Sequence, residues 1–248
     1  METADNTPAP ARRVAFFGGS FDPPHLGHLA VARAARAALE LDTVLFAPVG
    51  AQPLKTQGSI ASYEDRLRMT RLAIAGEPGF EVSLADAPKS SGEPNYTLET
   101  LEKLRKELGD DCLFFFLIGE DSFLGLRKWH RAAEIPFAAP LIVASRPGQR
   151  LDGVKDALPP GLTMYSAPVR DEMHNGVEMR SFLITNQVGE RAILYLLPGL
   201  DVPISASDIR DGMRDGDRAG MRQQMENASR ELVPEAVAEY VLAHGLYR

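Results

Sequence analysis

The sequence is poor in cysteine and in positive charge, and it has no long hydrophobic run. Cys112 is the single cysteine among 248 residues, which rules out an internal disulfide and fits a reducing compartment. Asp and Glu outnumber Lys and Arg by 34 to 27, and the net charge of -7 argues against a general nucleic-acid or membrane binder. No stretch approaches the roughly 20 apolar residues of a membrane span, and residues 1–13 lack an apolar signal core. We therefore expect a cytoplasmic protein that meets any bound phosphate locally.

Apolar segments of strand length alternate with amphipathic segments of helix length along most of the chain. Strands are expected at 14–17, 43–49, 80–85, 113–119 and 141–145, and helices at 25–41, 62–76 and 97–108. Strands joined by helices of this length form βαβ crossovers, so the pattern predicts an α/β fold with a doubly wound parallel sheet. Ligands of such sheets bind beyond the carboxyl ends of the strands.

The length allows one hydrophobic core with a small appendage. We expect a disordered leader over residues 1–12, an α/β core over 13–203, and a C-terminal helical part of the same domain over 204–248. The alternating pattern weakens over 151–192. Near the end of that segment, SFLITNQ and RAILYLL flank a short turn and predict a hairpin.

The segment VAFFGGSFDPPHLGHL, residues 14–29, has the pattern of a buried strand, a glycine pair and a helix start. Gly18 and Gly19 let the backbone turn without a Cβ penalty. The first N–H groups of the helix are unpaired and its dipole end is positive, which favours an anion. His25 and His28 share one helix face and can direct imidazole N–H donors at the same phosphate oxygens. The segment therefore predicts a triphosphate site.

A zinc site is the main alternative for two histidines at this spacing, but the sequence offers no evident third ligand. The other histidines, His130, His174 and His244, are scattered, and Cys112 precedes an apolar run in which a buried structural thiol is expected. Neither a G-x-G-x-x-G fingerprint nor a Walker lysine pattern is present. We therefore predict no metal held by protein side chains. Gly27, which has no side chain, leaves room for phosphate at the first turn of the helix.

ISASDIR, from Ile204 to Arg210, is the second strong signal. Ser205 with Asp208 fits a capping box, and a well-capped helix is enough to explain the serines. It does not explain Arg210, because a cation near a helix start opposes the dipole unless an anion lies nearby. Ser207 adds a further hydroxyl at the same place.

These segments resemble the motifs of a known group of enzymes. GGSFDPPHLGH resembles the (H/T)xGH signature of the nucleotidyltransferase superfamily, and ISASDIR resembles its ISSTxIR segment with Ala206 and Ser207 in place of a Ser-Thr pair. IGEDSFLGLRKWHRAAEI, residues 118–135, and PNYTLETL, residues 94–101, resemble the IGxDxxxxLxxW and YTxxTL segments of bacterial nicotinate-nucleotide adenylyltransferases. The closing LVPEAVAEYVLAHGLY is similar to that family's end, so the resemblance covers most of residues 14–247.

The resemblance implies a Rossmann-like nucleotidyltransferase fold in which nicotinate mononucleotide attacks the α-phosphorus of ATP, giving deamido-NAD and pyrophosphate. The nucleophile is a phosphate oxygen that is already ionised, so neither a covalent intermediate nor a strong general base is needed. Mg²⁺ is expected to be held mainly by the ATP phosphates and water. ATP and nicotinate mononucleotide are the expected partners, and the sequence leaves homo-oligomer formation open.

The resemblance also implies roles for individual residues. The catalytic set is His25, His28, Lys55 and Arg210; the ATP-binding set is Gly18, Gly19, Ser20, Phe21, Gly27, Gly119, Asp121, Ile204, Ser205 and Ser207; the mononucleotide-binding set is Thr97, Trp129 and Arg146. Several have an ordinary alternative: Thr97 and Asp121 could cap helices, Trp129 could be a half-buried packing residue, Lys55 could be solvated, and Arg146 could be a surface arginine. Leu54 stands where the family commonly has histidine.

Three other functions stay open. A related enzyme could act on nicotinamide mononucleotide or on phosphopantetheine, and a nucleotide-binding regulator could have kept the site without turnover. Trp129 and the YTLETL segment count against phosphopantetheine, and the intact HLGH with Arg210 counts against the regulator. The acid and amide mononucleotides differ by one group, which the sequence does not distinguish.

Overall fold

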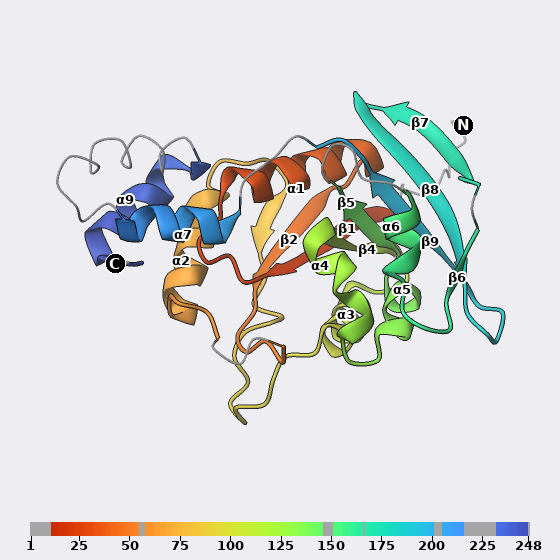
Figure 1. The fold of residues 1–248 in the computed structure, drawn as a ribbon, viewed down its shortest axis with the longest axis horizontal. Helices are drawn as coiled ribbons and strands as arrows, with labels where there is room; N and C mark the ends of the chain where they lie inside the picture. The colour runs from red at the N-terminus through yellow and green to blue at the C-terminus, as the bar shows by residue number, and fades with distance from the viewer. Residues whose placement is uncertain are drawn as a thin grey trace, which may run out of the picture.

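The strands form one mixed sheet (Figure 1). The computed structural model describes residues 11–54, 58–145, 151–165, 167–200, 205–215 and 232–247. Within this part of the chain the nine strands lie in the order β3-β2-β1-β4-β5-β9-β8-β6, and β7 pairs with β8. They are β1 (Arg12–Gly19), β2 (Thr43–Pro48), β3 (Phe80–Val82), β4 (Cys112–Gly119), β5 (Leu141–Ala144), β6 (Thr163–Met164), β7 (Arg170–His174), β8 (Val177–Thr185) and β9 (Arg191–Leu197).

The helices connect and cover these strands. They are α1 (Leu26–Leu39), α2 (Tyr63–Ala73), α3 (Thr97–Leu108), α4 (Glu120–Leu124), α5 (Ile135–Ala138), α6 (Leu151–Asp156), α7 (Ala206–Asp215) and α9 (Glu235–His244), with 3-10 turns at Leu126–Lys128 and Ala132–Glu134. Ser62 starts α2 because its hydroxyl accepts the N–H of Asp65 at 3.0 Å. Of the helices in the described residues, none combines the length and the apolar character needed to cross a membrane.

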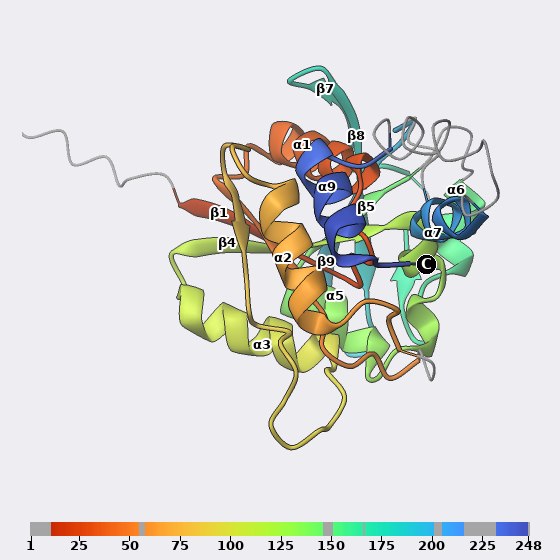
Figure 2. The ribbon, with the colours of Figure 1, turned by 90° about the vertical axis from the view of Figure 1, so that its left-hand side faces the viewer.

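The central strand β1 divides the core, because its side chains alternate between the two faces of the sheet. Val14 and Phe16 pack in a cluster with α3, whereas Ala15 and Phe17 pack in a cluster with α1, α2 and α9. All four side chains are at most 5% exposed, as expected for a central strand of a parallel sheet. Figure 2 shows α9 lying beside α2, with which it is in contact.

The prediction of a doubly wound parallel sheet is confirmed. β2 and β4 flank β1, and β3, β5 and β9 continue the parallel pairing outwards. The chain reverses its winding direction between β1 and β4, which is the place where ligands bind in folds of this kind. The glycines at the ends of both strands, Gly18 with Gly19 and Gly119, therefore lie beside a crevice that the topology itself creates.

The atypical segment 151–192 adds antiparallel strands to one end of the sheet. The predicted hairpin is confirmed as β8 and β9, and β9 also pairs parallel to β5. A second hairpin, β7 with β8, was not predicted because β7 is mostly exposed and polar. Its turn is Asn175-Gly176, with φ values of 48° and 80°, a pair that favours two-residue hairpins. Asn175 also donates to the Ala37 carbonyl of α1 at 2.9 Å.

Some predicted boundaries differ from the structure. β3 ends at Val82 rather than at 85, because the Ser83 hydroxyl accepts the N–H of Ala85 at 3.2 Å and a turn between Leu84 and Ala87 follows. The leader predicted over residues 1–12 lies outside the described residues except for its last two positions, and Arg12 already pairs with Cys112 in the sheet. Of the C-terminal helical part predicted over 204–248, the structure describes residues 205–215 and 232–247, which contain α7 and α9.

Candidate active site

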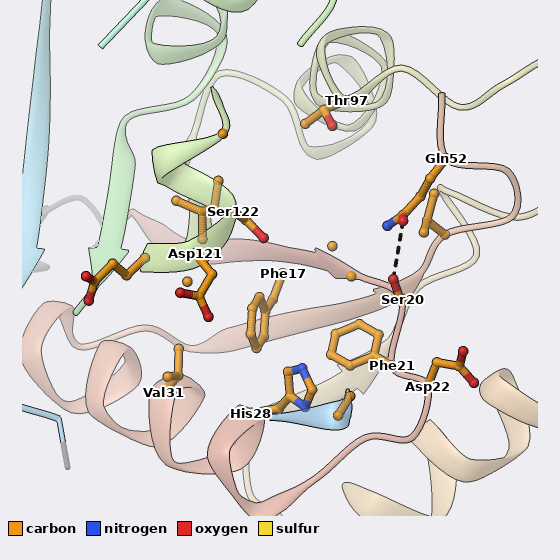
Figure 3. Close-up of a pocket in the computed structure, with 18 of the residues that line it drawn as sticks. Phe17, Ser20, Phe21, Asp22, His28, Val31, Gln52, Thr97, Asp121 and Ser122 are labelled. Atoms are coloured by element: carbon orange, nitrogen blue, oxygen red, sulfur yellow. Dashed lines mark hydrogen bonds between the residues drawn. The ribbon is translucent and has the colours of Figure 1, made fainter. Parts of the chain in front are cut away.

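A cavity of about 900 Å³ opens at the carboxyl ends of β1 and β4 (Figure 3). Every predicted site residue that the structure describes lines it: Gly18, Gly19, Ser20, Phe21, His25, Gly27, His28, Thr97, Gly119, Asp121, Trp129, Ser205, Ser207 and Arg210. The remaining three, Lys55, Arg146 and Ile204, lie outside the described residues. Segments from both halves of the chain thus form one site.

The turn after β1 is built differently from the prediction. Gly18 and Gly19 belong to β1 and continue its pairing with β2, so the glycine pair does not make the turn. The left-handed residue is Phe21, with φ 46°. Gly18 instead leaves room for Phe16, because a Cβ on it would lie 2.9 Å from the Phe16 ring and would displace it.

The two histidines lie at the start of α1, where His25 is the N-cap and His28 the third helical residue. Their ring centroids are 3.7 Å apart, and the backbone N–H of His25 donates to His28 Nδ1 at 3.2 Å. A neutral imidazole that accepts at Nδ1 carries its hydrogen on Nε2. Burial, and secondarily the neighbouring His25, lower the pKa of His28 well below 6.5. His28 is therefore a neutral donor at physiological pH.

Two aromatic rings that also line the cavity pack against His28. The Phe21 ring meets the His28 ring edge to face at 4.9 Å, and Phe17 lies at 6.0 Å (Figure 3). Phe21 in turn packs on Phe17 at 5.6 Å. This apolar packing restricts the rotamer of His28 and aims it at the cavity.

Arg66 of α2 is a buried residue that the sequence analysis missed. Its side chain is 2% exposed, and it donates to the carbonyls of Ser20 at 2.7 Å, Val49 at 2.8 Å and Ala61 at 3.4 Å. It therefore ties the loop after β1 to the loop after β2 and to the start of α2. Within an amphipathic helix pattern, an arginine gives no sign that it is buried.

The start of α7 contacts the loop between β1 and α1 through polar residues. Ser205 accepts the N–H of Asp208 at 3.1 Å, so the predicted cap is confirmed. Arg210 lies beyond the first turn of α7 and donates to the Asp22 carbonyl at 2.7 Å and to Ser207 Oγ at 3.2 Å. These acceptors give the guanidinium protein partners near the helix start, and the anion expected beside Arg210 stays a prediction.

The far wall of the cavity comes from α3 and the turn after α4. Thr97 is the first residue of α3 and Tyr96 is its N-cap, so the capping alternative for Thr97 was wrong. The Tyr96 ring packs on His130 at 4.5 Å. Trp129 is partly buried and lies 6.3 Å from Phe116, so it packs on the core and also lines the cavity.

Asp121 lines the cavity, and it does not cap a helix, which was the alternative that the sequence left open. The N-cap of α4 is Gly119, and Asp121 lies within the first turn, pointing into the cavity (Figure 3). It is an exposed carboxylate across the cavity from His28. At the entrance, Ser20 Oγ donates to Gln52 Oε1 at 3.3 Å, and Leu54 is 59% exposed.

Two further polar residues of the wall, Asp86 and Asn95, were not predicted. Asn95 accepts the N–H of Ala51 at 3.1 Å and donates to the Ala87 carbonyl at 3.0 Å, which locks the approach to α3. The carboxyl of Asp86 accepts from the Thr100 hydroxyl and is 5% exposed, and burial raises its pKa. In the part of the chain that is described, no group of three or more His, Cys, Asp or Glu side chains could hold a metal ion.

Comparison with known proteins agrees with this geometry. A cytidylyltransferase-like family model matches residues 16–212. The probable nicotinate-nucleotide adenylyltransferase of Sodalis glossinidius is 35% identical over 237 residues, covering 94% of this chain and 96% of the relative. That of Roseiflexus sp. is 36% identical over 235 residues, covering 95% and 98%.

The chain belongs to the nicotinate-nucleotide adenylyltransferase family. Its fold also matches a solved structure of Plasmodium falciparum nicotinic acid mononucleotide adenylyltransferase complexed with NaAD, with a TM-score of 0.63, 16% identity, and coverage of 95% of this chain and 97% of that one. The same enzyme complexed with APC matches with a TM-score of 0.62.

Some of the missed cavity residues lie inside the segments that resemble the nicotinate-nucleotide adenylyltransferase family. Asp22 lies in residues 14–29, the signature segment, Asn95 and Tyr96 lie in residues 94–101, and His130 lies in residues 118–135. Their place within these segments could have identified them. Asp86 and Gln52 lie in loops without a pattern, and only the folded chain brings them to the cavity.

Proposed function

We propose that this protein transfers the adenylyl group of ATP to nicotinate mononucleotide, forming deamido-NAD and releasing pyrophosphate. The observation that carries the proposal is the cavity at the ends of β1 and β4, which has N–H donors and a cation on one side and an aromatic wall on the other. Its volume of about 900 Å³ suits ligands of nucleotide size. The names of the relatives, at about 35% identity over nearly the whole chain, support the same activity.

The reaction exchanges one phosphoanhydride bond for another. A phosphate oxygen of the mononucleotide attacks the α-phosphorus of ATP, and the new O–P bond forms as the bond from the α-phosphorus to the bridging β-phosphate oxygen breaks. Pyrophosphate leaves with that electron pair. Such a transfer needs in-line positioning and stabilisation of negative charge rather than a protein nucleophile.

The side chains around the signature loop fit the charge-stabilising part of this reaction. His28 offers its Nε2–H, the first N–H groups of α1 point to the same region, and Arg210 adds a permanent positive charge. Because His28 stays neutral, it donates a hydrogen bond to a phosphate oxygen without first having to be protonated. Lys55 is proposed to add a second cation from the loop after β2.

The aromatic wall fits the pyridine half of the acceptor. Trp129 is partly exposed and lines the cavity, and an electron-poor pyridine is proposed to pack against its ring in an offset arrangement. Thr97 and Tyr96 at the start of α3 and the His130 ring close the same side. Asp121 is proposed to accept hydrogen bonds from ribose hydroxyls.

Mg²⁺ is proposed to enter with the triphosphate of ATP. The described residues contain no ligand cluster that would hold the ion alone, and the donors that line the phosphate side are cations and N–H groups. This donor set fits an ion held by phosphate oxygens and water. When bound, Mg²⁺ neutralises phosphate charge.

The decisive experiment is a pyrophosphate-release assay with ATP and a panel of acceptors: nicotinate mononucleotide, nicotinamide mononucleotide and phosphopantetheine. Release that is fastest with nicotinate mononucleotide supports the proposal. Faster release with either other acceptor reassigns the substrate. ATP binding without release for any acceptor favours a regulatory protein instead.

A further inference from the structure

Tyr247, which follows α9, is bonded to the loop between β1 and α1. Its hydroxyl donates to Asp22 Oδ1 at 2.8 Å, and both side chains are 4% exposed. Burial, and then the Asp22 carboxylate, raise the pKa of Tyr247, so the hydroxyl keeps its proton and stays a donor at neutral pH. Tyr247, the third residue after the end of α9, thus reaches the middle of the signature segment.

Asp22 connects several distant segments at this point. Its carboxylate also accepts the backbone N–H groups of Ile60 at 2.7 Å and Ala61 at 3.1 Å. Its carbonyl accepts from Arg210 of α7 at 2.7 Å. The approach to α2, the helix α7 and the segment after α9 are therefore all held by one loop residue.

The loop needs this support because it contains a residue in an unfavourable conformation. Phe21, directly before Asp22, has φ 46°, and Tyr247 has φ 65°. A left-handed backbone is unfavourable for a residue with a Cβ and persists only where surrounding contacts hold it. Arg66 on Ser20 and the bonds to Asp22 fix the backbone on both sides of Phe21, whose ring packs on His28.

We propose that Tyr247 is a positioning residue of the adenylyl-transfer site, an inference that rests on the proposed function. It acts through Asp22, which holds Phe21 against His28 and receives Arg210. Removal of the hydroxyl leaves the buried carboxylate short of one donor and lets the loop relax. A displacement of about 1 Å at reacting groups is enough to cost up to about a hundredfold in rate.

Tyr247→Phe tests the proposal, with Tyr240→Phe as the matched control. Tyr240 lies in α9 and its hydroxyl also donates to an aspartate, Asp65 Oδ1 at 2.9 Å, but it does not line the cavity. We expect Tyr247→Phe to lower kcat at least about tenfold, with the KM for nicotinate mononucleotide changed less than about twofold. Tyr240→Phe should keep the wild-type kcat.

Hydrogen exchange gives a readout that needs no turnover. Backbone amides between Phe21 and His28 should exchange faster in Tyr247→Phe than in wild type. Their exchange rates in Tyr240→Phe should equal those of wild type. A folded Tyr247→Phe with wild-type kcat and wild-type exchange overturns the proposal, as does an equal loss of kcat in both variants. If Tyr247→Phe does not fold, Asp22→Asn is measured instead, and wild-type kcat in that variant overturns the proposal.

The proposed function and this inference fail in different ways. Absence of pyrophosphate release by the wild-type protein overturns the function. The exchange comparison then decides the positioning role alone, because it depends only on the folded protein. Faster exchange confined to the loop supports Tyr247 as its anchor, and unchanged exchange overturns it.

Discussion

Replacing His28 should separate its role in the reaction from its role in the fold. In the proposed reaction the side chain offers one neutral Nε2–H donor to phosphate, and its Nδ1 accepts the His25 N–H at 3.2 Å. Loss of one donor to a developing negative charge typically costs about 10² to 10³ in kcat, or about 2.7–4 kcal/mol. We therefore expect His28→Ala to lower kcat in pyrophosphate release by at least about a hundredfold, and His28→Gln to recover part of it.

The matched control is His174→Ala. His174 lies in β7, and its exposed Nε2 is 3.3 Å from Oε1 of Glu40, at the opposite end of α1 from His28. That variant should keep the wild-type kcat. Circular dichroism and urea unfolding check that each variant is folded. A folded His28→Ala with kcat within a few-fold of wild type would refute the assignment.

The pH dependence provides a second test of the same reasoning. The folded-state pKa of His28 lies well below 6.5, whereas the unfolded chain takes up the proton near 6.5. Wild-type stability should therefore fall, relative to His28→Gln, as pH drops below 6.5, and the two should run parallel above it. The wild-type kcat/KM should show no His28 titration near pH 6.5. Urea unfolding from pH 5 to 8 measures the first, and a kcat/KM profile the second.

Three further predictions concern other parts of the cavity. Trp129→Ala should raise the KM for nicotinate mononucleotide more than the KM for ATP; equal increases would indicate that only its packing on Phe116 matters. Asp86→Asn should gain stability relative to wild type as pH rises from about 4 to 7, because the raised pKa makes ionisation of the buried carboxyl costly; a pH-independent difference in urea unfolding would contradict this. Gly18→Ala should lose about 1–3 kcal/mol in the same assay, because its Cβ would meet the Phe16 ring at 2.9 Å, and wild-type stability would show that the ring moves freely.

The parts of the site that are formed by residues close together in the sequence could be predicted from the sequence. The signature segment contains strand, loop and helix start within residues 14–29, so its histidines could be placed from spacing alone. Ser205 could likewise be recognised as a cap from the residues that follow it. Each of these predictions depends only on residues that are neighbours in the sequence.

The contacts that hold the loop could not be predicted in the same way. Arg66 contacts carbonyls up to 46 residues away, and Arg210 and Asp22 are separated by 188 positions. Such pairs have no spacing rule, since they follow from how the helices pack on the sheet. The same holds for the left-handed turn: glycine is the usual residue at positive φ, and the tertiary contacts of Phe21 override that preference.

The contacts of Arg66 have a consequence for how freely the surrounding loops can vary in sequence. All three of its acceptors are backbone carbonyls, so the interaction depends on the path of the main chain and not on which side chains stand at Val49 or Ala61. Replacements there that preserve the path should leave the interaction intact, whereas insertion of a single residue would displace an acceptor. The buried arginine therefore constrains the length of these loops more strongly than their composition.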